Sequence, residues 1–371
     1  MKKSLFIAIT IITIFASCGN KTAQGEGGDT LKLKYARLLT IVKHNGYTTV
    51  DIANPWYKGK VLHKYVLVPS DRKVPDDISH DGTVIRTPLK RSIVFTTVHC
   101  ALIQNIGARS SIAGVCDLKY IKIPWIQQQC NQHKIADCGE GMGPNIEKII
   151  DTKPDAILLS PFQNSGGYGK LEEIGVPLIE CADYMEYSAL GRAEWMKLYG
   201  LLYGCEQKAD SLFNVVDSCY KAGKSYAGTL KSHPIVLMDK ITGSVWYVPG
   251  GESTMGQMIK DAGGKYVFAG DKHSGSTALP FETVLAKAGN ADVWLTRDGS
   301  PESLNKMLTE NAAYAQFNAY KRKNVYSCNV EDSKFYEESP FRPDYLLQDF
   351  IRIFHPESNK QVDLKYFYLV K

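Results

Sequence analysis

The stretch that decides the fold reads PNIEKIIDTKPDAILL, residues 144–159. A proline precedes a helical segment, Glu147 lies in its first turn, paired apolar residues follow, and an apolar run typical of a buried strand ends the stretch. A second stretch, PFETVLAKAGNADVWL at residues 280–295, repeats this order with Glu282 in the first turn. Two copies of one helix–strand unit predict two similar α/β lobes.

The segment between the two copies predicts how the lobes are joined. Residues 190–227 contain neither a proline nor a strand signal, and their apolar residues recur near helical spacing. One helix of this length would reach roughly 50 Å, with Gly200 and Gly204 as the points where it would bend. Short apolar strands alternate with helices on both sides, which indicates mostly parallel sheets. We therefore expect an N-terminal lobe at 91–189, a connecting helix at 190–227 and a C-terminal lobe at 228–371.

The N-terminus has the pattern of an export signal. Lys2 and Lys3 precede an apolar run from Leu5 to Phe15, too short to span a bilayer, which needs ~20 helical residues. Small residues directly before Cys18 resemble a bacterial lipoprotein signal, in which residues 1–17 are removed and Cys18 is lipidated. An ordinary signal peptide with an incidental Cys18 is the alternative. We expect a periplasmic protein that is anchored to the membrane by lipid.

Two further segments precede the first lobe. Residues 18–30 are polar and glycine-rich, as a flexible tether should be. Residues 31–90 are predicted to form a β-rich extension. Within it, two apolar runs flank His44-Asn45-Gly46, which is a hairpin signal because Asn-Gly supplies the positive φ that the turn requires.

Composition and motifs exclude several classes of protein. Of 371 residues, 44% are hydrophobic and 22% charged, which is typical of globular proteins with packed cores. The net charge of +5 lacks the strong basic stripe of a nucleic-acid binder, so no nucleic-acid partner is expected. The nine cysteines contain no Cys-x-x-Cys, and the eight histidines show no paired spacing. We therefore predict no catalytic residues and no metal site. A metal-dependent or redox enzyme is the distant alternative, and the disulfide connectivity stays open.

The order of lipoprotein signal, α/β lobe, long helix and second α/β lobe resembles the iron-chelate and vitamin B12 substrate-binding proteins of ABC importers. The resemblance covers roughly residues 91–356 and rests on Ile112–Val115, Pro144–Glu147, Lys153–Leu158, Leu171–Pro177, Glu282 and Arg342–Asp344. It implies the class III periplasmic binding protein fold, in which two Rossmann-like α/β lobes are joined by a single long α-helix. The β-rich extension lies outside the usual core of this family.

The resemblance also implies a function. Proteins of this family hold a metal chelate in the cleft between the lobes and present it to the permease and ATPase subunits of an ABC importer. In the family, one glutamate at the tip of each lobe docks on permease arginines, and Glu147 and Glu282 occupy those places. A carboxylate in the first turn of a helix is favoured by the macrodipole and can stay exposed for a cationic partner. A monomer without a resident cofactor is expected. The ligand is an iron chelate (a siderophore or haem), with cobalamin as the alternative.

Candidate ligand contacts follow the strands, because ligands of α/β lobes bind at the carboxyl ends of strands. Aromatic side chains offer walls to a porphyrin, corrin or catecholate, and arginines pair with anionic groups. The candidates are Tyr120, Trp125, Met142, Phe162, Tyr184, Trp246, Tyr247, Arg297, Tyr336 and Arg342. Trp246 and Tyr247 are adjacent in a strand, so one of the two should face the core.

Overall fold

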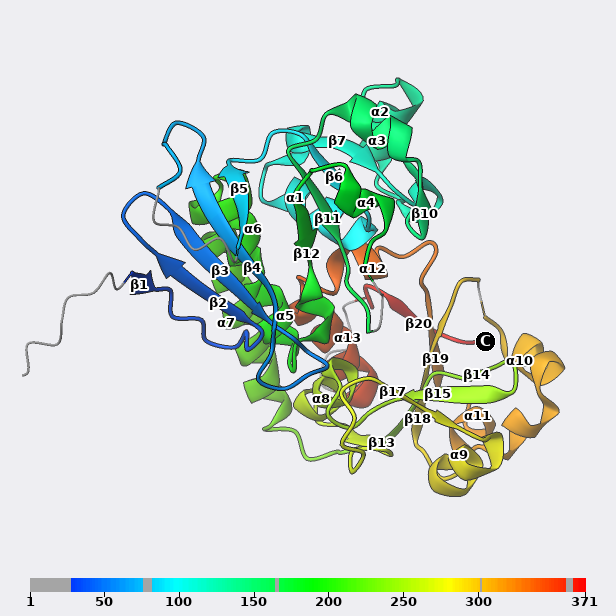
Figure 1. The fold of residues 1–371 in the computed structure, drawn as a ribbon. Helices are drawn as coiled ribbons and strands as arrows, with labels where there is room; N and C mark the ends of the chain where they lie inside the picture. Colours follow the sequence, from blue (N-terminus) through cyan, green and yellow to red (C-terminus); the bar gives the residue numbers. More distant parts are fainter. Residues whose placement is uncertain (1–27, 76–81, 164–166, 301, 358–362) are drawn as a thin grey trace, which may run out of the picture.

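The computed structural model describes residues 28–75, 82–163, 167–300, 302–357 and 363–371. The predicted signal peptide and the lipidated Cys18 lie outside these residues. The described chain forms an N-terminal sheet, two α/β lobes and a helical connection (Figure 1).

The N-terminal sheet has five strands in the order β1-β2-β3-β4-β5. They are β1 (Asp29–Thr30), β2 (Leu39–Lys43), β3 (Thr48–Ala53), β4 (Val61–Pro69) and β5 (Thr83–Thr87). The strands pair antiparallel except for β4 and β5, which are parallel. Gly46 has a φ of +99° between β2 and β3, which confirms the predicted hairpin.

The first lobe is built on a parallel sheet in the order β12-β11-β6-β7-β8. Its strands are β6 (Ser92–Val94), β7 (Ile112–Val115), β8 (Ala136–Asp137), β11 (Ala156–Leu159) and β12 (Leu178–Glu180). Its helices are α1 (Thr97–Asn105), α2 (Pro124–Asn131), α3 (Ile146–Thr152) and α4 (Lys170–Glu173). A short hairpin of β9 (Gly139–Glu140) and β10 (Gly143–Pro144) precedes α3. All four residues of β11 are buried, as its apolar sequence predicts.

The second lobe repeats this plan with the sheet order β16-β13-β18-β19-β20, in which only β20 runs antiparallel to its neighbour. Its strands are β13 (Ile235–Met238), β16 (Lys265–Tyr266), β18 (Val293–Asp298), β19 (Val325–Asn329) and β20 (Phe367–Leu369). Its helices are α8 (Thr254–Asp261), α9 (Phe281–Ala288), α10 (Leu304–Glu310), α11 (Asn318–Lys321), α12 (Phe335–Glu338) and α13 (Pro343–Phe354). A smaller antiparallel sheet contains β14 (Ile241–Thr242), β15 (Val245–Pro249) and β17 (Ser276–Leu279).

The connection between the lobes is three helices rather than the one continuous helix expected over residues 190–227. These are α5 (Ala189–Glu194), α6 (Met196–Tyr203) and α7 (Glu206–Ala227). Gly204 ends α6 with a φ of +65°, so the chain turns there and α7 packs back on α6. Gly200 permits the close approach, since a Cβ at that position would lie 2.8 Å from the Ala209 Cβ. The single long helix that leads into the second lobe is α7.

Residues 34–38, which we call the strap, tie the N-terminal sheet to the connection. Three backbone N–H groups of residues 34–36 donate to the buried carboxylate of Glu194 at 3.0, 2.7 and 3.0 Å. The next two, in residues 37–38, donate to the buried carboxylate of Glu186, each at 3.0 Å. Because buried carboxylates are costly without donors, these five N–H groups and two acids hold one another in place.

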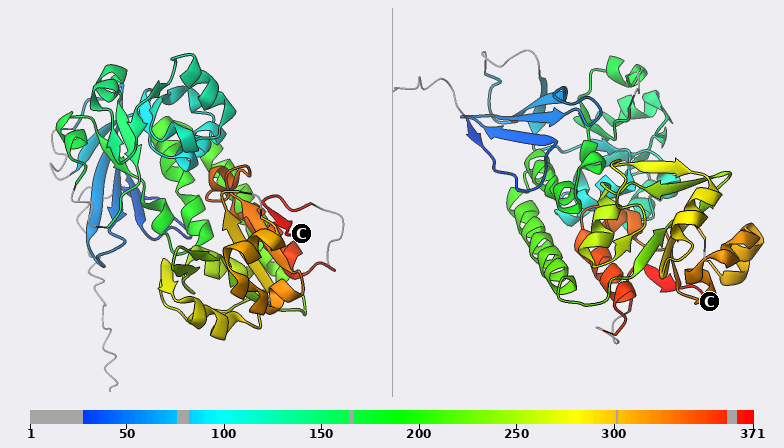
Figure 2. Two further views of the ribbon diagram at one scale, coloured as in Figure 1. Left: turned by 90° about the vertical axis from the view of Figure 1, so that its right-hand side faces the viewer. Right: turned by 90° about the horizontal axis from the view of Figure 1, so that it is seen from below.

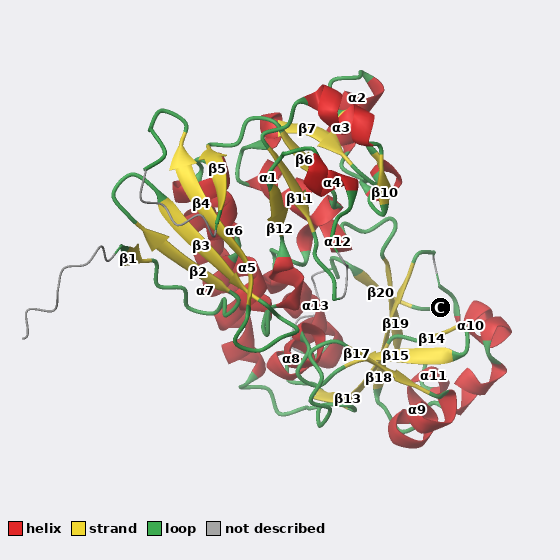
Figure 3. Ribbon diagram, in the orientation of Figure 1, coloured by secondary structure: helices red, strands yellow, loops and turns green. Residues whose placement is uncertain are grey.

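The three parts of the molecule pack around the connection. The helices flank the strands in both lobes (Figure 3). The helix α7 packs along α13, and the two lie side by side in the right-hand view of Figure 2. From the second lobe, α12 packs on α1 of the first, and the Thr97 hydroxyl donates to Glu337 at 3.2 Å. Two α/β lobes joined by a helical connection that ends in the long helix α7, with an added N-terminal sheet, confirm the predicted fold class.

The cysteines of the described residues are all free thiols. Most are buried, and burial raises the pKa of the Cys130 thiol to about 11. The buried ones therefore act as small apolar core residues.

Candidate functional site

A cavity of about 230 Å³ lies between the two lobes. Its lining from the first lobe and the connection comes from the segment after β12, with Tyr184, and from α5, with Arg192. The second lobe contributes the start of α8, the end of β18 and the segment from α12 to α13. The ends of β12 and β18 are carboxyl ends of parallel strands, which is where an α/β lobe presents its binding loops.

Arg192 reaches the cavity from α5 and is held from behind by a buried acid. Its Nε donates to Asp183 Oδ2 at 2.9 Å, and Asp183 Oδ1 lies 2.8 Å from His99 Nε2. Asp183 is fully buried. Burial alone would raise the pKa of Asp183, but His99 and Arg192 more than offset it, so this pKa lies below its ordinary value. Asp183 is therefore a carboxylate that fixes the direction of Arg192.

Arg297 reaches the same cavity from the end of β18. Its Nε and Nη2 donate to the two carboxylate oxygens of Asp239 at 2.9 and 2.7 Å. Burial alone would lower the pKa of Arg297, but the Asp239 carboxylate raises it above its ordinary value and the guanidinium stays charged. Because this pair uses Nε and Nη2, the Nη1 group of Arg297 can donate hydrogen bonds to another partner. The Tyr336 side chain, 46% exposed, lines the same cavity.

The lining of this cavity favours anions. Among the described residues that line it, the charged side chains are the two arginines and none is acidic. Ser253 caps α8 by accepting from the Gly256 N–H, so the positive end of this helix also lies at the cavity. The arrangement can therefore bind a ligand with negative groups between two cations, one from each side of the cleft.

Three of the predicted ligand residues meet in this cavity: Tyr184, Arg297 and Tyr336. For Trp246 the prediction is wrong, because its side chain is fully buried. Its indole lies 5.7 Å from that of Trp294, and its Nε1 donates to the Met238 carbonyl at 3.1 Å. The sequence shows that Trp246 and Tyr247 face opposite ways, but the sheet partners decide which of them enters the core.

The other six candidates do not line this cavity. Tyr120, Met142, Phe162 and Tyr247 are exposed elsewhere on the lobes. Trp125 lies under the guanidinium of Arg109, whose carbon is 5.1 Å from the ring centroid.

Arg342 is engaged by its neighbours in the sequence. It makes a bidentate pair with Asp344 at 2.9 and 2.6 Å and lies 3.7 Å over the Tyr345 ring. These contacts stabilise the start of α13 and leave the neighbouring Pro343 to line the cavity.

Arg192 lines the cavity but is not among the residues that the sequence predicts at the ligand. It belongs to the segment that was expected to be only a connecting helix. The sequence does contain a signal for it, because Arg192 and Glu194 are charged residues inside a helical run that is otherwise mostly apolar. Charged side chains in such a run require partners, and Arg192 and Glu194 both have them.

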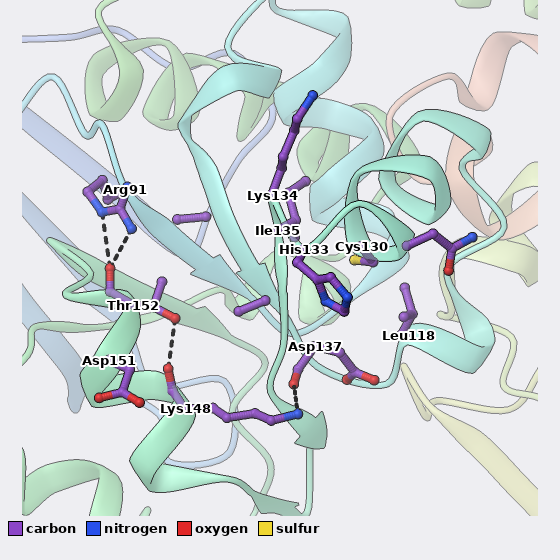
Figure 4. A pocket seen from close by; sticks show the side chains of 13 residues that line it. Arg91, Leu118, Cys130, His133, Lys134, Ile135, Asp137, Lys148, Asp151 and Thr152 are labelled. Atoms are coloured by element: carbon purple, nitrogen blue, oxygen red, sulfur yellow. Dashed lines mark hydrogen bonds between the residues drawn. The ribbon is translucent and has the colours of Figure 1, made fainter.

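A larger hollow of about 680 Å³ lies at the β8 edge of the first lobe, between α2 and α3 (Figure 4). Two of its basic side chains are engaged by nearby backbone carbonyls. Arg91 donates to the Thr152 carbonyl at 3.0 and 2.6 Å, and the Lys148 ammonium donates to the Asp137 carbonyl at 3.1 Å. Its lining comes from the first lobe alone, so it lacks the two-lobe arrangement of the inter-lobe cavity.

One group of acids in the second lobe has the spacing of metal ligands, namely Asp298, Glu302 and Glu310. The Lys240 ammonium lies among them, at 2.7, 2.6 and 2.6 Å from the three carboxylates. This single ammonium pairs with all three carboxylates and occupies the place that a cation would need.

The two predicted docking glutamates are exposed in the first turns of corresponding helices, Glu147 in α3 and Glu282 in α9. In Figure 1 the two helices lie far apart, one on each lobe. This placement leaves both carboxylates available to an outside partner.

A family model described as periplasmic binding protein matches residues 101–331, more than half of the chain. The chain belongs to the periplasmic binding protein family. An uncharacterized lipoprotein of Methanocaldococcus jannaschii is 29% identical over 361 residues, which cover 90% of this chain and 84% of that protein. The petrobactin-binding protein YclQ of Bacillus subtilis is 23% identical over 237 residues, which cover 63% of this chain and 61% of YclQ.

Solved structures of the family share the fold. Staphylococcus aureus IsdE complexed with haem has a TM-score of 0.56 and 22% identity, covering 71% of this chain and 98% of IsdE. The molybdate-bound MolA of Haemophilus influenzae has a TM-score of 0.59 and 18% identity, covering 76% of this chain and 90% of MolA. The predicted resemblance to substrate-binding proteins of ABC importers is confirmed. In the described part of the chain, no helix combines the length and apolar character that crossing a membrane requires.

Proposed function

We propose that this protein binds an anionic iron chelate, a siderophore or haem, between its lobes and delivers it to an ABC permease without catalysis. The observation that carries the proposal is the pair Arg192 and Arg297, which line one cavity from opposite sides of the cleft, with no acid in its described lining. A ligand with negative groups would pair with both arginines at once. Tyr184 and Tyr336 supply aromatic surface beside them.

The named ligands of relatives support this chemistry. YclQ is a petrobactin-binding protein, and IsdE is complexed with haem, whose propionate groups are negatively charged. MolA holds molybdate, which is also an anion. A cobalamin ligand is the second candidate from the sequence. Cobalamin is less favoured because the groups at its edge are mostly neutral amides. Such groups would leave Arg192 and Arg297 without negatively charged partners in the ligand.

Delivery requires partners outside the described structure. We propose that Glu147 and Glu282 dock on cations of the permease, whose ATPase subunits drive import, and that the binding protein acts as a monomer on the periplasmic side. We further propose that Cys18 carries the lipid anchor, in keeping with the lipoprotein name of the M. jannaschii relative. Two lipid chains are enough to anchor a protein stably to a membrane.

Ligand binding is tested with a panel of chelates of different charge. Native mass spectrometry and tryptophan fluorescence would compare haem, ferric citrate, a ferric tris-catecholate, a neutral ferric trihydroxamate and cobalamin. We expect anionic chelates to bind, and Arg192→Gln to weaken them about tenfold or more, since a charge-assisted hydrogen bond contributes about 1.5–3 kcal/mol. The control is Arg322→Gln, which removes an exposed arginine paired with Asp292. Binding of cobalamin alone, or anion binding unchanged in Arg192→Gln, would overturn the proposal.

Anchoring is tested by Cys18→Ser. The variant should leave the membrane fraction, while its thermal unfolding should stay as in the wild type because the polar, glycine-rich sequence around Cys18 is predicted to be a tether. Wild-type protein in the same fractionation is the reference. A Cys18→Ser protein that remains membrane-bound after a high-salt wash would show that the lipid is not the anchor.

A further inference from the structure

The N-terminal extension reaches the ligand cleft through the strap. A second hollow, of about 440 Å³, lies between the strap and the start of α8. The strap contributes Lys34, Tyr35 and Arg37 to its lining. The other side is formed by Glu252 and Gln257 of the second lobe.

This hollow adjoins the arginine cavity. Tyr187 and Ser188 line the hollow, while the next residue, Ala189, lines the cavity. On the second lobe, Glu252 lines the hollow, while Ser253 and Thr254 line the cavity. The two spaces therefore share a border on both lobes.

The unpaired charge in this hollow is that of Arg37. Its backbone N–H is bound to Glu186, but its guanidinium has no ion-pair partner among the described residues and lies 5.8 Å from the Tyr187 ring centroid. The other two charged side chains of this hollow, Lys34 and Glu252, each form an ion pair. The Lys34 ammonium pairs with Asp217 at 3.2 Å, and Glu252 pairs with Lys272 at 3.4 Å.

We propose that the strap forms a wall of the ligand cleft and that Arg37, with Tyr187, is a second anion subsite beside the Arg192 and Arg297 cavity. It would hold a further negative arm of the same chelate: a carboxylate, a propionate or a catecholate. The guanidinium supplies the charge and the exposed Tyr187 ring supplies an apolar surface for the arm. This subsite rests on the proposed function, and it gives the extension a part in ligand recognition.

Arg37→Gln tests the subsite without disturbing the strap, because the bonds to Glu186 come from the main chain. The matched control is Arg109→Gln, which also removes an exposed arginine over an aromatic ring, Trp125, but away from the cleft. Affinities for haem, ferric citrate and a ferric tris-catecholate would be measured at low and high salt. Thermal unfolding of each variant would establish that it is folded.

We expect Arg37→Gln to weaken the best-binding anionic probe about tenfold and to reduce the salt dependence of its affinity. Arg37→Lys should restore part of the affinity, whereas Arg109→Gln should match the wild type. If Arg192→Gln weakens binding and Arg37→Gln does not, for every probe that the wild type binds, the subsite is overturned while the proposed function stands. If the wild type binds none of these probes, both proposals fall together.

Discussion

At the scale of single residues, each arginine of the inter-lobe cavity is held in position by an ion pair with a carboxylate. Asp183 is the clearest case, since it is fully buried between His99 and Arg192. Removing its charge would leave Arg192 without its anchor on the first-lobe side of the cleft. We therefore expect the position of Arg192 and the stability of the fold to be coupled at this carboxylate.

Asp183→Asn tests this coupling. We expect a loss of about 3 kcal/mol in the free energy of unfolding at pH 7, because breaking a buried ion pair leaves an uncompensated charge. The pKa of Asp183 is lowered in the folded protein, so its stabilising effect is present above the unfolded value of about 4 and is lost as the pH falls through the folded value. Urea unfolding from pH 7 to pH 3 should show the wild type and the variant converging in acid. The exposed Asp151→Asn is the control, and a constant difference at all pH values would contradict the interpretation.

At the scale of elements, the strap is held by hydrogen bonds to buried carboxylates in addition to the pairing of its neighbouring strands. Five consecutive backbone N–H groups donate to two buried carboxylates, Glu194 in α5 and Glu186 just before this helix. The Tyr35 hydroxyl adds a bond to Asp217 of α7 at 2.7 Å. The extension is thereby fixed to the helices that join the lobes, rather than attached only by its sheet.

Glu194→Gln tests how much the strap contributes. The amide replaces one accepting oxygen by a donor that faces backbone N–H groups, so we expect a loss of about 2–3 kcal/mol in the free energy of unfolding. Trypsin should also cut faster at Lys34 and Arg37, because the strap would detach more often. Glu206→Gln, an exposed glutamate at the start of α7, should change stability by less than about 0.5 kcal/mol. Equal stability and equal cleavage rates in the two variants would refute the role given to Glu194.

At the scale of the whole molecule, transport and binding are assigned to different surfaces. Glu147 and Glu282 do not line the inter-lobe cavity, whose lining comes from other segments. Their symmetric places in α3 and α9 suit a partner that contacts both lobes at once. The two functions should therefore be separable by mutation.

The double variant Glu147→Lys and Glu282→Lys tests this separation. Ligand affinity should stay within about threefold of the wild type, which is roughly 0.7 kcal/mol. Import by the cognate transporter should fall sharply, and more with Lys than with Ala, because Lys opposes the permease cations instead of only losing them. Glu206→Lys provides a matched exposed glutamate at a helix start away from the lobe tips. Wild-type import by the double variant would end the docking proposal, and a large loss of affinity would place these glutamates at the ligand.

The sequence by itself determined the features that depend only on neighbouring residues, namely the helix–strand units of the two lobes and the first hairpin. The helix–strand unit of residues 144–159 and its copy at 280–295 predicted both lobes, because periodicity and helix-start signals depend on neighbours in the chain. The Asn45-Gly46 turn predicted its hairpin for the same reason.

Tertiary structure decided everything that depends on distant partners. Arg192 and Arg297 are 105 positions apart in the chain and line one cavity only because the two lobes face each other across it. Trp246, predicted at the ligand, is buried because the surrounding aromatic side chains of the second lobe close over it. The path of the strap is set by Glu186 and Glu194, about 150 residues away in the chain, whose buried carboxylates accept its backbone N–H groups. A pattern along the chain reports which face of an element is apolar, but the partner that covers that face is set by the packing of the whole molecule.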